Sequence, residues 1–203
     1  MNLGVDDMSV RNEHAGERRG PWAGLGGLPV AAAALTGTVA IYMALVAFGN
    51  LTDFGTNRQF VRHVLAMDTT FKDPDLMWRA IESTVLQDAA YVAIIAWETL
   101  TACVLLVATW LWCAGLRRRA YDRARRVSSV GLVMVLLLFG LGFMAIGGEW
   151  FVMWQSSDWN GLDAAARNVM LAGVALVAVH LRSAVPDTPA ASESPAASES
   201  AAA

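Results

Sequence analysis

Four long apolar stretches limit what this chain can fold into more than any other feature of its sequence. A bilayer core about 30 Å thick needs about 20 mostly apolar residues in each helix that crosses it. The composition agrees, because 56% of the residues are hydrophobic and only 16% are charged. The stretches predict an all-α fold, a four-transmembrane-helix bundle with spans at residues 28–48, 89–115, 127–147 and 162–184.

The predicted spans differ in the charges they contain. The first and third have none, and the second has only Glu98. The fourth has Asp163 and Arg167 in its first turns, and Arg167 can extend its guanidinium from a helix end to the lipid headgroups. A cleaved signal sequence is the alternative for the first stretch, but its 21 residues exceed the usual apolar region of such signals. A retained span is therefore favoured.

Basic residues predict the orientation of the bundle. Residues 116–126, between the second and third spans, contain six arginines and one aspartate, whereas residues 150–161 contain no basic side chain. Arg11, Arg18 and Arg19 also precede the first span, and Arg182 lies at the far end of the fourth. Cytoplasmic loops of membrane proteins carry an excess of Lys and Arg. We therefore expect a multi-pass protein of the bacterial inner membrane with both termini in the cytoplasm and residues 49–88 and 148–161 outside.

The two ends of the chain are predicted to be tails around a membrane domain of residues 28–184. Residues 1–27 mix charges and glycines without a period, which is typical of a flexible cytoplasmic arm. Residues 185–203 contain the hexamer PAASES twice and offer little that could pack in a core. We expect this second segment to be a disordered cytoplasmic tail.

The first external segment, residues 49–88, is too long and too patterned to be a simple connection. Thr56 can cap a short helix in which the apolar residues between 60 and 65 share one face. Asp73 as a cap, followed by Pro74 at the first helical position, predicts a second helix. We expect two short amphipathic helices that lie at the membrane interface over the bundle.

Several strings in the predicted external segments resemble a known family. They are NLTDFGTN (50–57), FVRHVLAMDTTF (60–71) and GGEWFVMWQSSDWNG (147–161), together with Glu98 in the second span. They resemble the bacterial family of predicted small integral membrane proteins, domain of unknown function 2165, over residues 28–184. This resemblance implies a membrane architecture and, because the family has no established activity, no mechanism or catalytic residue.

Glu98 is the most unusual residue within a span, because a carboxylate at bilayer depth costs several kcal/mol unless it is paired, neutral or facing a cavity. Its depth depends on where the second span enters the membrane. Glu98 lies near the midplane if the span begins at residue 89, and near the surface if Trp97 belongs to the outer aromatic belt and Trp110 and Trp112 to the inner one. An ion pair with Arg167 and a functional acid are both open interpretations.

The string 147–161 contains three tryptophans where the third span emerges. Membrane interfaces are enriched in tryptophan, so anchoring explains these side chains. It does not explain the carboxylates beside them. The predicted interface anchors are Trp97, Trp150, Trp154 and Trp159, and the candidate ligand or ion residues are Glu98, Glu149, His63, Asp68, Arg167 and Asp158. No metal or cofactor is predicted, because the spacing of these residues matches no ligand motif.

Three classes of function agree with these features. The first is a non-enzymatic accessory or scaffold protein whose external face docks on a partner or binds a ligand, and the absence of catalytic motifs favours it. The second is a small oligomeric transporter or channel that uses Glu98 for a proton or cation. The third is a membrane enzyme. The expected partners are the lipid bilayer and another membrane protein or further copies of this chain, and the net charge of −3 argues against nucleic acid.

Overall fold

The computed structural model describes residues 27–118 and 120–181, so most of the predicted arm and the whole predicted tail lie outside the described residues. The described part is helical and contains no strand. Four helices in it are long and apolar enough to cross a membrane, as the sequence predicts. They are α1 (Leu28–Thr52), α3 (Thr84–Arg118), α4 (Asp122–Leu136) continued by η2 (Leu137–Trp150), and α5 (Leu162–His180).

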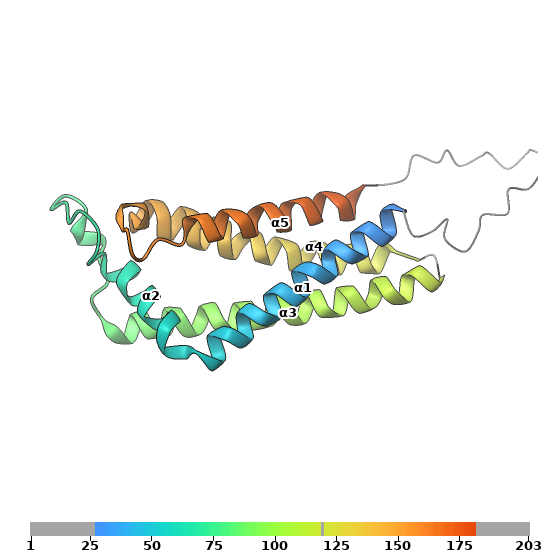
Figure 1. The fold of residues 1–203 in the computed structure, drawn as a ribbon, viewed down its shortest axis with the longest axis horizontal. Coiled ribbons are helices and arrows are strands. Elements are labelled where there is room, and N and C mark those ends of the chain that lie inside the picture. The colour runs from blue at the N-terminus through green and yellow to red at the C-terminus, as the bar shows by residue number, and fades with distance from the viewer. Residues whose placement is uncertain (1–26, 119, 182–203) are drawn as a thin grey trace, which may run out of the picture.

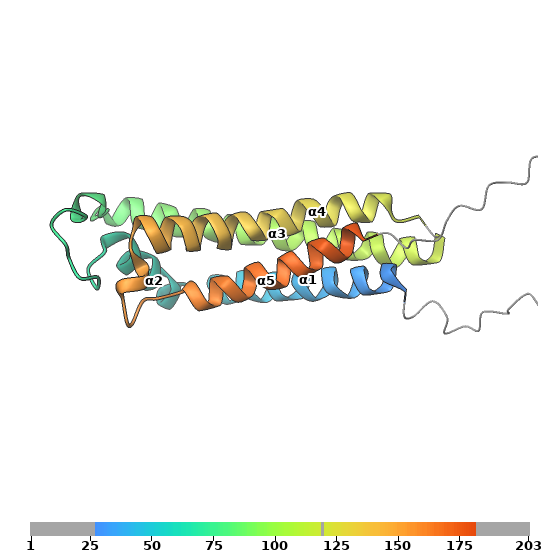
Figure 2. The same ribbon diagram turned by 90° about the horizontal axis from the view of Figure 1, so that it is seen from above.

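The four spans lie side by side along the long axis of the molecule (Figures 1 and 2). At one end lie α2 (Phe54–Ala66) and the segment 151–161, and we call this the loop end. At the opposite end lie the link between α3 and α4 and the first and last described residues. We call this the arginine end, because the link belongs to the arginine-rich segment 116–126.

The spans differ in length, and this difference makes room for α2. With 35 residues, α3 is about 52 Å long, well beyond the hydrocarbon thickness of about 30 Å. At the loop end α3 and η2 extend past α1 and α5, and α2 occupies the remaining space (Figure 1). Val61 of α2 packs there in a small core with Tyr91 and Ile95 of α3. The loop end is therefore a folded cap on the bundle.

Apolar side chains pack the interior of the bundle, and a polar cluster lies near the arginine end. Trp112 is fully buried and donates its indole N–H to Ser128 Oγ at 2.9 Å. Thr36 Oγ1 also donates to Ser128 Oγ, at 3.4 Å. Trp112 therefore faces the inside of the bundle, unlike in the alternative that places it in an inner aromatic belt, because its one polar atom finds a partner there. Trp110, by contrast, is 67% exposed.

The second half of the third span, η2, is wound as a π-helix. Its last turn shows the wider pattern, since the Phe151 N–H donates to the Ile146 carbonyl five residues earlier, at 3.0 Å. Most π-helical segments are single turns, often at functional sites, so a π-helix of 14 residues is unusual. Four glycines, at positions 140, 142, 147 and 148, lie in this segment. The sequence did not predict this winding.

Only the first of the two helices predicted in segment 49–88 is formed as an α-helix. It is α2, and it begins at Phe54 rather than at Thr56, whose hydroxyl donates to Asp53 Oδ1 at 3.0 Å. The helix predicted from Asp73 is absent. The Asp73 carboxylate instead accepts the Asp75 N–H at 3.0 Å in a tight turn, and only the three-residue 3-10 helix η1 (Met77–Arg79) follows.

The segment after η1 remains extended because it bonds back to α2. The Ile81 N–H donates to the Leu65 carbonyl at 2.8 Å, and the Gln87 side-chain amide donates to the Ile81 carbonyl at 2.7 Å. These tertiary bonds satisfy polar groups that a helix would have satisfied locally. The segment therefore ties α2 to the start of α3.

Candidate functional site

Two adjoining pockets lie at the loop end, below α2. The first has a volume of about 250 Å³ and is lined partly by polar side chains, so we call it the polar pocket. The second has a volume of about 310 Å³ and is lined almost entirely by apolar side chains, so we call it the apolar pocket. The polar residues of the polar pocket are Tyr42, Asn50, Asn57, Tyr91, Glu98 and Asn168. These residues come from four different helices, so the site exists only in the folded bundle.

Glu98 is the acidic residue of the polar pocket, and it is only 2% exposed. The Asn50 side-chain amide donates to Glu98 Oε2 at 2.5 Å, and Tyr91 donates its hydroxyl to the Asn50 carbonyl at 3.2 Å. No ion pair to Glu98 occurs within residues 27–118 and 120–181. The carboxyl group is thus buried with an amide as its partner rather than a cation.

The predicted ion pair between Glu98 and Arg167 is not formed. Arg167 is exposed, while its neighbour Asn168 is buried and lines the polar pocket. Successive residues of an α-helix point about 100° apart, so only one of the two can face this cavity. The amide of Asn168, rather than the guanidinium of Arg167, is what α5 contributes to the polar pocket.

Glu98 lies near the loop-end terminus of α1 but well inside α3. Its partner Asn50 is two residues from the end of α1, so Glu98 lies level with the loop-end terminus of that helix. Along α3, however, it is about 21 Å from the first residue, Thr84. The adjacent Trp97 is 38% exposed and donates its indole N–H to the Met134 carbonyl at 3.0 Å. Trp97 therefore joins α3 to α4 as well as facing outwards.

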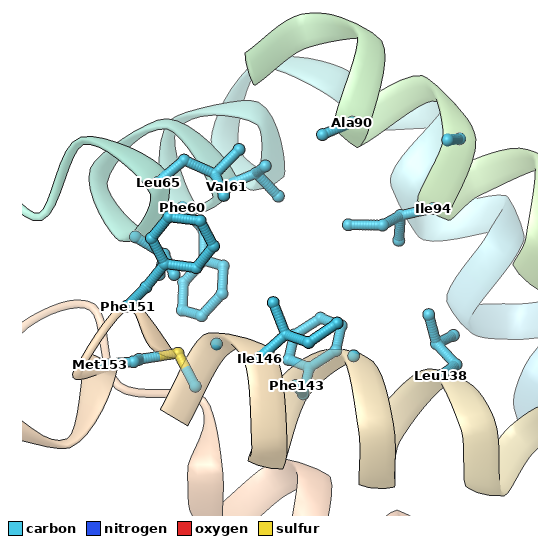
Figure 3. Close-up of a pocket in the computed structure, with 14 residues that line it drawn as sticks. Phe60, Val61, Leu65, Ala90, Ile94, Leu138, Phe143, Ile146, Phe151 and Met153 are labelled. Atoms are coloured by element: carbon cyan, nitrogen blue, oxygen red, sulfur yellow. The ribbon is translucent and has the colours of Figure 1, made fainter. Parts of the chain in front are cut away.

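The apolar pocket lies between α2, α3, η2 and the residues that follow η2. Figure 3 shows Phe60, Val61 and Leu65 of α2 opposite Phe143 and Ile146 of η2, with the α3 side chains closing a third side. Phe151 and Met153 lie at the end of the pocket (Figure 3). The remaining lining residues are Val64, Ala90, Ala93, Ile94, Leu138, Gly142 and Gly147. The wide π-helical winding thus forms one wall of an apolar cavity.

The two pockets share part of their lining, namely Phe60, Val61, Ile94 and Phe143. The rings of Phe60 and Phe143 are stacked, with centroids 6.3 Å apart. Phe60 also meets the edge of Trp159 at 6.2 Å. Gly161 is required for this arrangement, because a Cβ atom there would lie 2.9 Å from Phe60 Cζ. Phe60 is therefore the side chain that joins the segments of the loop end to both pockets.

An ion-pair cluster holds α2 against α3. Arg58 Nε and Arg62 Nε both donate to Asp88 Oδ1, at 2.7 and 3.0 Å, and the Nη2 atoms of both arginines bond to Oδ2. Hydrogen bonding to Asp88 raises the pKa of the Arg58 guanidinium. The spacing of the two arginines, four residues apart, places them on one helical face. Sequence reasoning did not identify Asp88, because its partners lie 26 and 30 residues earlier.

Two of the predicted external site residues come together outside the pockets. His63 Nδ1 lies 2.8 Å from Asp68 Oδ2, and the His63 ring stacks on Trp159 at 4.5 Å between centroids. Glu149 and Asp158 are exposed and form no side-chain hydrogen bond or ion pair within the described part of the chain. No group of three or more His, Cys, Asp or Glu residues suited to a metal ion occurs in that part either.

The tryptophans of segment 147–161 pack against segment 49–88. Trp150 meets Trp78 edge to face at 5.5 Å, and the Arg79 guanidinium lies 4.9 Å from the Trp150 ring. Trp154 contacts Phe71 in the same edge-to-face manner, at 6.0 Å. Trp150 and Trp154 nevertheless remain about half exposed. They join the two segments of the loop end, and part of each indole ring remains exposed.

The comparison with protein families agrees with this architecture. The family described as predicted small integral membrane protein (DUF2165) matches residues 28–182, which include all four candidate spans and the segments 49–88 and 148–161. No match was found among curated proteins or among solved structures. The chain thus belongs to the family of predicted small integral membrane proteins, domain of unknown function 2165.

Proposed function

We propose that this chain is a non-enzymatic accessory protein of the membrane whose loop end binds a small apolar ligand. The observation that carries this proposal is the apolar pocket of about 310 Å³. Ligand pockets in proteins have volumes of roughly 300–1,000 Å³ and are lined mainly by apolar side chains with a few polar groups. The apolar pocket lies at the lower end of this range, and the polar pocket beside it supplies the polar groups.

The folded cap supports a binding role. Two external segments are joined by the hydrogen bond between Thr69 Oγ1 and Ser156 Oγ at 2.8 Å and by the stack of His63 on Trp159. The cap in turn carries Phe60 into the lining of both pockets. Such an arrangement holds a pre-formed site, which lowers the entropic cost of binding. The exposed tryptophans of the cap are also suited to docking on another membrane protein or on a second copy of the chain.

The orientation of the protein is part of the proposal. We place the arginine end in the cytoplasm and the loop end outside, in a bacterial inner membrane, because arginine-rich loops are retained on the cytoplasmic side. The amphipathic helix α2 would then lie at the external interface. A single cysteine introduced into residues 119–121 should resist an impermeant thiol reagent in intact cells. Labelling there before lysis would reverse the assignment.

A neutral photolabel tests the apolar ligand directly. The protein is reconstituted in phosphatidylcholine vesicles and irradiated with a trifluoromethyl phenyl diazirine, a small apolar molecule. We expect saturable labelling of peptides that contain residues 60–65 and 143–153, which an excess of non-photoreactive analogue suppresses. Residues that only face lipid should be labelled without saturation.

The control is a matched pair of substitutions on α3. Ala90 lines the apolar pocket, whereas Ala89 is exposed and does not line it. Ala90→Phe should fill the pocket and abolish the saturable component, and Ala89→Phe should leave it unchanged. Equal labelling of both variants, or labelling that never saturates in the native protein, would contradict the proposal.

Proton- or cation-coupled transport is the second candidate, and the burial of Glu98 favours it. Beyond the polar pocket, however, the bundle is packed by fully buried residues such as Val39, Met43 and Leu105. Transport would require this core to open or further copies of the chain to supply a path. Glu98→Gln should abolish proton uptake into vesicles if transport is the function. If vesicles with the native protein take up no more protons than empty vesicles, this candidate is excluded.

A further inference from the structure

We infer that the two pockets together bind one single-chain amphiphile with an ammonium head, whose head lies in the polar pocket and whose alkyl chain lies in the apolar pocket. This inference rests on the proposed function and specifies the chemistry of its ligand. It follows from the composition of the polar pocket and from the residues that the two pockets share.

Among the described residues, no Arg, Lys or His side chain lines the polar pocket beside Glu98. Glu98 lines it at 2% exposure and is hydrogen-bonded there to the Asn50 amide. A buried carboxyl group is stable when it is neutral or when a cation lies against it. Arg167, the cation that the sequence suggested as a partner of Glu98, is exposed and does not line the pocket. A bound ammonium group would supply the missing cation.

Asn168 of α5 is a further polar residue that lines this pocket. It is 7% exposed, lines the polar pocket and makes no side-chain hydrogen bond within the described residues. Its amide oxygen is therefore available as an acceptor. An ammonium group has three N–H donors, which Glu98 and Asn168 can accept from two sides. A carboxylate or phosphate head would instead place a negative charge beside Glu98, so anionic lipids do not fit.

The chain of the ligand has a defined place because the pockets adjoin. Phe60, Val61, Ile94 and Phe143 line both, so an alkyl chain that leaves the polar pocket along these side chains enters the apolar pocket. The apolar pocket is close to the lower limit of ligand-pocket volumes, which suits one chain rather than two. A single-chain amine therefore fits the site better than a two-chain phospholipid.

Competition against the same neutral photolabel tests the head group. Decylamine, decanol and decanoate are compared in phosphatidylcholine vesicles, at concentrations corrected for their partition into lipid. We expect decylamine to suppress the saturable labelling at an at least tenfold lower concentration than decanoate, with decanol between them. In Glu98→Gln the advantage of decylamine over decanol should disappear.

The matched control is Glu149→Gln, which removes the same charge from an exposed position at the same end of the molecule. It should retain the native order of competitors. If Glu98→Gln does not insert, Asn168→Ala provides the second variant and should weaken decylamine selectively. Saturable labelling with equal competition by all three compounds would overturn this inference and leave the proposed function intact. No saturable labelling would overturn both.

Discussion

Replacing Gly131 with alanine should destabilise the bundle, because α3 and α4 approach each other at this glycine. A Cβ atom at position 131 would lie 2.6 Å from Leu105 Cδ2 and 2.7 Å from Leu105 Cγ. Leu105 is fully buried and cannot turn away without displacing other core side chains. Overpacking of this kind costs about 1–3 kcal/mol. Alanine regains about 0.5–1 kcal/mol over glycine in a helix, so the net loss is about 1 kcal/mol.

The control is Gly173 in α5, where an added Cβ atom meets nothing within 4 Å. Both sites are inside helices, so they share the gain in helix propensity and differ in packing. For a protein of this length, 1 kcal/mol corresponds to a shift in Tm of about 2–4 °C. Thermal unfolding followed by tryptophan fluorescence should show a lower Tm for Gly131→Ala and an unchanged or higher one for Gly173→Ala. An equal or higher Tm for Gly131→Ala would refute the close approach of α3 and α4.

Three further substitutions test the cap and the core. Gly161→Ala places a methyl group 2.9 Å from Phe60 Cζ, so the affinity for the photolabel should fall about tenfold, or by 1.4 kcal/mol. An affinity equal to that of the native protein would show that binding does not need Phe60 in this position. Asp88→Asn removes the charge that both arginines of α2 share, so amide hydrogen exchange in α2 should accelerate. Unchanged exchange would show that the ion-pair cluster does not hold α2 against α3. Trp112→Phe removes the donor to Ser128 and should lower stability by about 1–2 kcal/mol in thermal unfolding, whereas no loss would mean that this bond is unimportant.

The membrane spans could be predicted from the sequence because crossing a bilayer is a local demand on composition. About 20 apolar residues in a row suffice to identify each one. The sequence also showed that Glu98 needs a partner or a cavity, because it is the only charged residue of its predicted span. Its partner could not be identified, since Asn50 lies 48 positions earlier, on another helix. The rotation of α5 about its axis decides which of its side chains lines the polar pocket. A difference of one position in the sequence puts Asn168 there instead of Arg167.

The loop end was harder to predict because its structure depends on tertiary contacts. Asp73 and Pro74 are typical of a helix start, yet the following segment instead bonds to α2 through Ile81 and Leu65. The π-helical winding of η2 has no local sequence signal that we recognised, and the apolar pocket depends on it. His63 and Asp68, only five positions apart, did come together as a pair.

The central claim is that the loop end holds a small apolar or amphipathic molecule. The most direct measurement is native mass spectrometry of the protein taken from its own membrane in lipid nanodiscs. We expect one tightly held small molecule per chain, present in the native protein and in Ala89→Phe but lost from Ala90→Phe. A chain without any such molecule, or one that Ala90→Phe retains in full, would contradict this claim.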